Sequence, residues 1–118
     1  MKTIFVVDDN NVNLLLADKV LSDHYHVFTL PSALGMFELL EDIKPDLILL
    51  DILMPGMDGF EALKRLRANG RTADIPVIFL TGSEDEEINA EGLKLGAVGL
   101  VHKPFSKPAL LEFVTSHL

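Results

Sequence analysis

Apolar residues along this chain gather in five short runs, and the segments between the runs have the spacing of amphipathic helices. The runs cover residues 3–7, 26–30, 47–50, 75–80 and 98–101. The third and fourth runs are apolar at successive positions, without the alternation of a strand that has one face in water. Such runs are typical of strands whose two faces are both covered by helices. We therefore predict five strands in one parallel sheet.

Capping residues mark where several helices begin. Asp58 and Ser83 are each followed three residues later by a glutamate, as in a capping box. These pairs predict helices that begin near Gly59 and near Glu84. A third helix is expected after Ser106, because a proline two residues later suits a first helical turn, where its missing N–H costs nothing. That helix would run to the C-terminus.

The order of elements is therefore strand then helix, five times over. Because crossovers between parallel strands are right-handed, this order predicts a doubly wound (βα)5 α/β fold, a three-layer sandwich with helices on both faces of the sheet. The 118 residues fit one domain, residues 1–118. No linker, repeated motif or low-complexity segment interrupts the pattern.

Composition and charge exclude several classes of protein. With 48% hydrophobic residues the chain has ample apolar material for a core. A net charge of -8 argues against direct binding to nucleic acid or to an anionic membrane. The chain has no cysteine, which excludes disulfides, thiolate zinc sites and cysteine nucleophiles. No stretch approaches the ~20 apolar residues that span a bilayer. These features are compatible with a cytoplasmic location.

Polar residues with chemical potential follow the predicted strands. Asp8 and Asp9 end the first run, Asp51 the third and Thr81 the fourth, while Lys103 lies just past the fifth. Ligands of open parallel sheets bind at the carboxyl ends of the strands, so all five side chains are expected at one edge. A buried carboxylate without a partner costs several kcal/mol by a rough estimate. These acids therefore need a cation.

Magnesium is the cation that fits a cluster of oxygen ligands without histidine or cysteine. With its charge screened, Asp51 could act as a nucleophile toward phosphorus. Lys103 and the metal would neutralise the oxygens of the transferred group, and Thr81 could donate a hydrogen bond to it. Each residue also has a simpler interpretation: a helix cap for Asp8 or Asp9, a loop acid for Asp51, a strand-end hydroxyl for Thr81 and a solvated amine for Lys103. Those separate interpretations do not explain why all five residues are expected at the same edge of the sheet.

Four motifs make the chain resemble the receiver domains of two-component response regulators over essentially its whole length. They are VVDDN at 6–10 with Asn13 after it, DILMPGMDG at 51–59, LTG at 80–82 and HKPF at 102–105. The resemblance implies a flavodoxin-like sheet in the order 2-1-3-4-5. It also implies a phosphorelay function, in which a histidine kinase or a histidine phosphotransfer protein donates a phosphoryl group and the domain then controls an output domain or a target protein.

The resemblance also assigns roles to residues. Asp51 would be the phosphorylated residue. Asp9, Asp51 and the backbone carbonyl of Leu53 would bind Mg²⁺, and Asp8 would act through a metal-bound water. Thr81 and Lys103 would contact the phosphoryl oxygens, and the bond between Lys103 and the following proline would be cis. Such a domain is not an enzyme beyond promoting its own phosphorylation and slow dephosphorylation.

Three features of the sequence bear on how such a domain would switch, assemble and lose its phosphoryl group. Leu100 stands where many members have a tyrosine or phenylalanine whose ring moves during switching, so the output through this region is an open question. Residues 97–99 lack the acidic pair of the transcription factors that dimerise through this face, so a monomer or weak dimer is expected. Leu53 is apolar and would orient an attacking water poorly, which predicts a long-lived phosphoaspartate.

Three other functions fit the sequence less well. An aspartyl-nucleophile phosphohydrolase would need a second acid where Leu53 stands, and a flavodoxin would not carry acids after its first strand. A pseudo-receiver that acts only as an interaction module would usually have lost one of the key residues, and none is lost here. His24 and His26 lack further ligands for a metal site and are assigned no chemistry.

Overall fold

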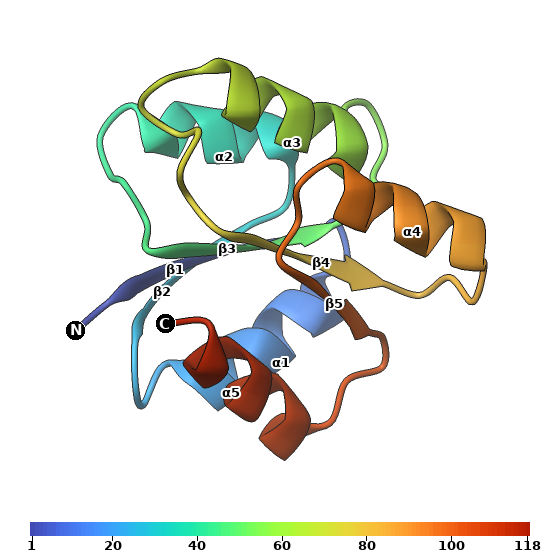
Figure 1. Ribbon diagram of the computed structural model, residues 1–118. Helices are drawn as coiled ribbons and strands as arrows, with labels where there is room; N and C mark the ends of the chain where they lie inside the picture. The colour runs from blue at the N-terminus through green and yellow to red at the C-terminus, as the bar shows by residue number, and fades with distance from the viewer.

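The computed structural model describes residues 1–118 and contains five strands and five helices that alternate along the chain (Figure 1). The elements are β1 Thr3–Val7, α1 Asn11–Leu21, β2 His26–Leu30, α2 Ala33–Leu40, β3 Leu47–Asp51, α3 Gly59–Ala68, β4 Val77–Thr81, α4 Glu86–Lys94, β5 Gly99–His102 and α5 Lys107–Ser116. The alternation confirms the predicted (βα)5 order. The longest helix has 11 residues, and no helix is long and apolar enough to cross a membrane.

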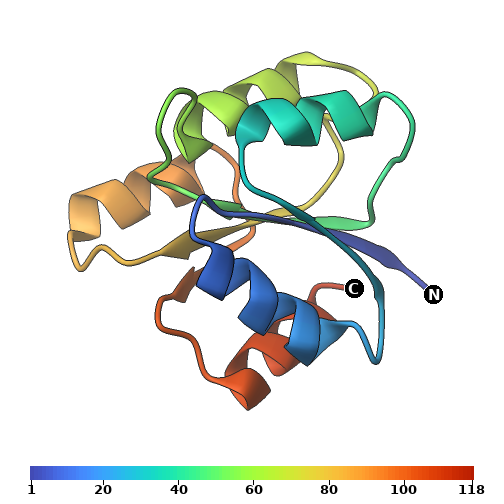
Figure 2. The same ribbon diagram turned by 180° about the vertical axis from the view of Figure 1, so that it is seen from behind.

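All five strands pair in parallel, in the order β2-β1-β3-β4-β5, which confirms the expected flavodoxin-like sheet. Helices α2, α3 and α4 cover one face, and α1 and α5 cover the other (Figure 1). The view from behind shows the same three layers (Figure 2). The order of the strands reverses at β1, so the carboxyl ends of β1 and β3 flank the crevice where ligands of such sheets bind.

The core consists of two apolar clusters, one on each face of the sheet. Successive side chains of a strand point to opposite faces, so Phe5 and Phe79 join the cluster of 16 buried residues, whereas Ile4 and Leu80 join the cluster of 13. Burying each large side chain contributes about 1.5–3 kcal/mol. The continuous apolar runs of the sequence therefore arise because the strands β1, β3 and β4 each supply both clusters.

Several predicted strand ends differ from the structure by one or two residues. β4 begins at Val77, two residues later than the predicted run 75–80, because the N–H of Ile75 donates to the carbonyl of Thr72 in the preceding turn and Pro76 has no N–H. The third strand extends one residue further than predicted. The fifth strand begins and ends one residue later.

The helix expected near Glu84 begins at Glu86, so this prediction was wrong by two residues. Ser83 does not cap the helix; its hydroxyl oxygen accepts the N–H of Asp85 at 3.0 Å. Asp85 is the cap, because its carboxylate accepts the N–H of Glu87 at 2.9 Å. In so acidic a stretch several side chains can cap, and the first of them need not do so.

The other two predicted helix starts are confirmed. The carboxylate of Asp58 accepts the N–H of Glu61, and α3 begins at Gly59. The hydroxyl oxygen of Ser106 accepts the N–H of Ala109, and α5 follows with proline in its first turn. These two caps fix the loops that follow β3 and β5, which both border the carboxyl edge of the sheet.

Candidate functional site

A hollow of about 240 Å³ opens at the carboxyl edge of the sheet. Side chains from the ends of β1, β3, β4 and β5 meet there, as the sequence predicted. The hollow is lined by Asp9, Asn10, Asn13, Asp51, Ile52, Leu53, Thr81, Gly82 and Lys103. The predicted residues of the site thus come from four strand ends that lie far apart in the sequence.

Three carboxylates converge at this edge. Asp8, Asp9 and Asp51 each offer an oxygen that lies within 4.8 Å of the other two. Asp8 and Asp51 are 0% and 3% exposed, whereas Asp9 is exposed to solvent. An oxygen-only donor set that is open on one side fits Mg²⁺, which binds through one or two carboxylates and keeps several waters. His24 and His26 join no such cluster.

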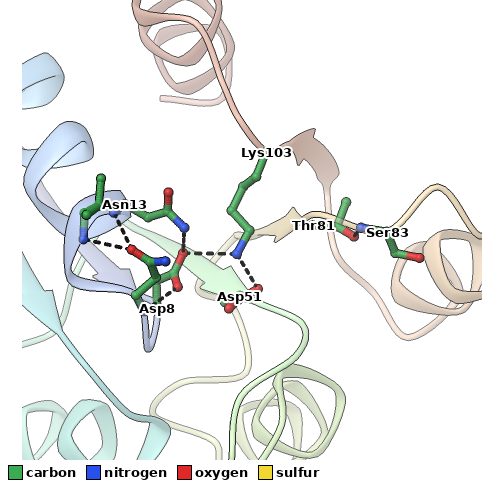
Figure 3. Close-up of polar contacts among 8 residues, drawn as sticks. Asp8, Asn13, Asp51, Thr81, Ser83 and Lys103 are labelled. Atoms are coloured by element: carbon green, nitrogen blue, oxygen red, sulfur yellow. Dashed lines mark hydrogen bonds and ion pairs between the residues drawn. The ribbon is translucent and has the colours of Figure 1, made fainter.

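Lys103 lies between the two buried carboxylates (Figure 3). Its Nζ is 3.0 Å from Oδ1 of Asp51 and 3.3 Å from Oδ2 of Asp8. The amine therefore supplies positive charge at the place where two carboxylates would otherwise repel each other. The bond from Lys103 to Pro104 is cis, as the family resemblance implied. The backbone N–H of Lys103 donates to the carbonyl of Thr81 at 2.7 Å, which joins the end of β5 to the end of β4.

Asp8 is held by the first turn of α1. Its Oδ1 accepts the N–H of Asn10 at 2.9 Å, and its Oδ2 accepts the side-chain amide of Asn13 at 3.1 Å. Asn10, and neither aspartate, caps this helix by accepting the N–H groups of Val12 and Asn13. The simpler interpretation of Asp8 or Asp9 as the helix cap is therefore wrong.

Asn13 takes part in the site, although the motif that contains it implied no role for its side chain. It lies three residues after the cap, and side chains of a helix lean toward its N-terminus, so its amide reaches back to the end of β1. A polar residue at this spacing after the cap was the available signal. Without the fold, which places the start of α1 beside Asp8, that signal does not identify the partner of the Asn13 amide.

Burial and charge shift the pKa of Asp51 in opposite directions. Burial raises the pKa, the hydrogen bond from Lys103 lowers it, and the negative charge of Asp8 raises it again, with the result that the pKa of Asp51 lies at about 6. For Lys103, burial alone would lower the pKa, but the hydrogen bond and charge of Asp51 outweigh it, and the pKa is raised. The amine therefore stays charged while the carboxyl titrates near neutrality.

The loop after β3 is packed closely against Asp51. The N–H of Gly59 donates to the carbonyl of Ile52 at 2.7 Å. A Cβ on Gly59 would collide with the carbonyl oxygen of Asp51 and would lie 2.8 Å from Cα of Ile52, so only glycine fits. Leu53 lines the hollow, and its side chain is 63% exposed. A water molecule near Asp51 would meet this apolar side chain at the rim.

Thr81 is buried at the last position of β4 and faces the loop that follows it. Its Oγ1 accepts the N–H of Ser83 at 3.0 Å, and the two residues lie side by side beyond Lys103 and Asp51 (Figure 3). One lone pair of the hydroxyl is thus used within the loop. Its proton is free to be donated to an anion in the hollow.

Comparisons with known proteins agree with the fold. The family described as response regulator receiver domain matches residues 4–115. The chain is 40% identical over 116 residues to a probable cyclic di-GMP phosphodiesterase of Vibrio cholerae; the match covers 98% of this chain and 26% of that protein. It is 32% identical to protein PilH of Pseudomonas aeruginosa, over 100% of this chain and 98% of that protein. Several relatives are longer, and the chain spans a quarter to a half of their length.

A solved structure gives the same result. The chemotaxis protein CheY4 of Vibrio cholerae superposes with a TM-score of 0.93 at 29% identity, and the match covers 100% of this chain and 99% of that chain. The match with the family extends from the first strand to the last helix. This chain belongs to the response regulator receiver domain family.

Proposed function

We propose that this receiver domain accepts a phosphoryl group on Asp51 from a phosphohistidine and changes conformation in response. Phosphorylation and Mg²⁺ binding are typical of its family, whose members are signalling domains and generally not enzymes. The observation that carries the proposal is the position of Asp51: a buried carboxylate beside two others, with the amine of Lys103 at 3.0 Å. Burying a carboxylate costs free energy even when a cation lies beside it, so a chemical role explains this residue better than a contribution to stability.

Asp9, Asp51 and the backbone carbonyl of Leu53 are the groups that would hold Mg²⁺, and Asp8 would act through a bound water. When bound, the ion supplies positive charge that neutralises the carboxylates and the phosphoryl oxygens. The oxygen-only donor set described above supports this assignment. Asn13 keeps Asp8 in place by its hydrogen bond at 3.1 Å.

The chain's own residues would then perform the transfer. A carboxylate oxygen of Asp51 attacks the phosphorus, the phosphorus–nitrogen bond of the phosphohistidine breaks, and the histidine leaves with the electron pair. Lys103, already charged, donates to the phosphoryl oxygens that form beside Asp51. This step needs the ionised carboxylate, and in the metal-free protein, where the pKa of Asp51 lies at about 6, the ionised fraction grows as the pH rises through that value.

Switching would follow from the new charge. A phosphoryl group adds about 1.5 to 2 negative charges and three acceptor oxygens, which favour the conformer in which Thr81 donates its hydroxyl to the group. A target protein or an output domain that prefers this conformer by about 1–3 kcal/mol would read the signal. We place this reaction in the cytoplasm, with the chain as a monomer or a weak dimer.

The proposal is tested by incubating the chain with Mg²⁺ and acetyl phosphate and measuring the intact mass. One added phosphoryl group is expected. It should be absent from Asp51→Asn and after chelation of the metal. A chain that gains no group would support the alternative, a pseudo-receiver that acts only as an interaction module. An adduct that persists in Asp51→Asn would show that another residue accepts the group.

A further inference from the structure

Ser83 is held by hydrogen bonds at both of its backbone groups. Its N–H donates to Oγ1 of Thr81 at 3.0 Å, and its carbonyl accepts the side-chain amide of Asn89 at 3.3 Å. Thr81 borders the hollow, and Asn89 lies inside α4. One residue of the loop thus joins the site to the helix that follows, through two side chains.

Asparagine is an unfavourable residue for position 89, inside helix α4. Its Oδ1 is buried and has no hydrogen-bond partner. Exchanging the amide oxygen and nitrogen would not help, because Oδ1 would then face the carbonyl oxygen of Ser83. A buried acceptor without a donor destabilises the fold, and asparagine also forms helices less well than alanine or leucine. A leucine of similar size would avoid both costs, so what asparagine supplies at this position is the hydrogen bond to the carbonyl of Ser83.

Helix α4 has few other attachments to the core. Gly92 is its only buried residue and lies against the ring of Phe79, while Ile88 packs partly buried against the same core cluster. At the neighbouring β5, Leu100 offers no ring that could move during switching. The bond between Asn89 and Ser83 is therefore a direct polar connection between the loop of Thr81 and this weakly anchored helix.

We propose that Asn89 is a positioning residue of the switch, which holds Ser83, and through it the hydroxyl of Thr81, in the unphosphorylated arrangement. The inference rests on the proposed phosphorylation of Asp51. When Thr81 turns its hydroxyl toward the phosphoryl group, Ser83 moves with Thr81 Oγ1, and the hydrogen bond from Asn89 breaks. The N-terminal turn of α4 is then released, which gives this chain a route to its output that needs no aromatic ring.

The test uses beryllium fluoride, a tetrahedral mimic of a phosphoryl group, with Mg²⁺ and the full chain. Asn89→Ala removes the hydrogen bond that opposes switching, so this variant should bind the mimic about fivefold more tightly than the wild type. Fivefold is the change in affinity that corresponds to the net free energy of about one hydrogen bond. The binding is measured by fluorine NMR. Glu91→Ala, two residues further along the same helix and exposed, is the matched control and should bind like the wild-type chain.

A second readout separates a switch from a structural role. In the free protein, the backbone amide signal of Ser83 in Asn89→Ala should shift toward its position in the mimic-bound wild type. Asn89→Leu, which also removes the unpaired oxygen, should raise the melting temperature and still bind the mimic more tightly. In a Thr81→Ala background the effect of Asn89→Ala should vanish, because Ser83 is then no longer tied to the hydroxyl.

Two outcomes would overturn the inference. If Asn89→Ala and Asn89→Leu bind the mimic within twofold of the wild type, Asn89 does not oppose switching, whatever their melting temperatures. If the tightening persists in the Thr81→Ala background, it does not act through the loop. A wild-type chain that neither binds the mimic nor takes up a phosphoryl group would defeat the proposed function, and this inference with it.

Discussion

At Asp51 the same surroundings that favour phosphoryl transfer work against the ionised carboxylate. Burial and the nearby charge of Asp8 raise its pKa, and the amine of Lys103 opposes them only in part, which leaves the pKa at about 6. The carboxyl of an unfolded chain has its ordinary pKa of 3.8. In the metal-free protein, Asp51 thus stabilises the fold only while it is protonated.

The stability of the metal-free protein should therefore depend on pH through this residue. Because the folded pKa is the higher one, the contribution of Asp51 is complete below 3.8 and is lost as the pH rises through about 6. Asp51→Asn cannot titrate. Between about pH 4 and about pH 7.5, its free energy of unfolding should therefore rise by up to about 3 kcal/mol relative to that of the wild type.

Urea unfolding in the presence of a chelator at both pH values measures this gain. Asp23→Asn, which removes an exposed carboxylate, serves as the control and should show little change between them. Equal differences between wild type and Asp51→Asn at both pH values would mean that the folded carboxyl titrates as it does in the unfolded chain.

We expect Leu53 to control a different property of Asp51, the lifetime of its proposed phosphorylated form. Its apolar side chain is exposed at the rim of the hollow and cannot orient water. Leu53→Asn should shorten the lifetime of the phosphoaspartate by about tenfold or more, because an amide can position the attacking water. The loss of the added mass after removal of the donor gives the rate.

Since the side chain is exposed, the substitution should leave the melting temperature nearly unchanged, which serves as its internal control. A phosphoaspartate that decays at the same rate in both proteins would show that Leu53 does not limit the access of water.

Sequence reasoning found the charged residues of the site because each follows an apolar run, and the fold brings such strand ends together. It named Asn13 only as part of a motif and Ser83 only as a helix cap, and it assigned nothing to Asn89. Their roles depend on hydrogen bonds between a helix and the end of a strand, and therefore on where α1 and α4 begin. No periodicity in the sequence fixes a helix start to a single residue in a polar stretch.

Among the helices, α4 has the fewest buried residues: only Gly92 is buried, and Ile88 packs partly buried against the core. A Cβ on Gly92 would lie 2.8 Å and 3.0 Å from two ring atoms of Phe79, which is fully buried. That ring also packs edge-on against Phe60, with centroids 5.6 Å apart. It has little freedom to move away, so the absence of a side chain at Gly92 determines how close the helix lies to the sheet.

Gly92→Ala should consequently destabilise the protein. Overpacking a filled site costs about 1–3 kcal/mol, whereas the higher helix propensity of alanine returns only about 1 kcal/mol. A net loss of about 1 kcal/mol is expected, measured by thermal or urea unfolding. Gly70→Ala is the matched control, since a Cβ there meets nothing within 4 Å, and it should be nearly neutral. A stabilised Gly92→Ala would mean that α4 shifts outward at little cost.

The type and order of the elements were predictable, while some of their ends were not. Apolar runs identify strands because a run sends side chains to both faces of the sheet; both faces are buried in β1, β3 and β4, whereas the edge strand β2 has no buried residue. Ends depend on local hydrogen bonds: β4 begins late because Ile75 belongs to a turn, and α4 begins late because two turns in succession precede it. Asp58 marked its helix correctly because no competing cap stands beside it.

For the whole molecule, the binding of a cation at the site and the stability of the fold are linked. The chain carries a net charge of -8, and three carboxylates of that excess converge at one edge of the sheet. Added salt will stabilise such a protein by general screening. A specific metal site must therefore be distinguished from screening by comparing ions at equal ionic strength.

Mg²⁺ should raise the melting temperature of the entire fold, because it binds the folded chain, in which the strand ends meet, and not the unfolded one. At a concentration about a hundred times its dissociation constant, a ligand stabilises by about 2.7 kcal/mol, which corresponds to about 10 °C for a domain of this size. Sodium chloride at equal ionic strength should give only a small part of that rise.

Asp9→Asn should remove most of the response to Mg²⁺ without lowering the metal-free melting temperature, since it deletes an exposed charge from a repulsive cluster. Equal rises with both salts, or a full Mg²⁺ response in Asp9→Asn, would rule out Asp9 as a ligand and leave screening as the explanation.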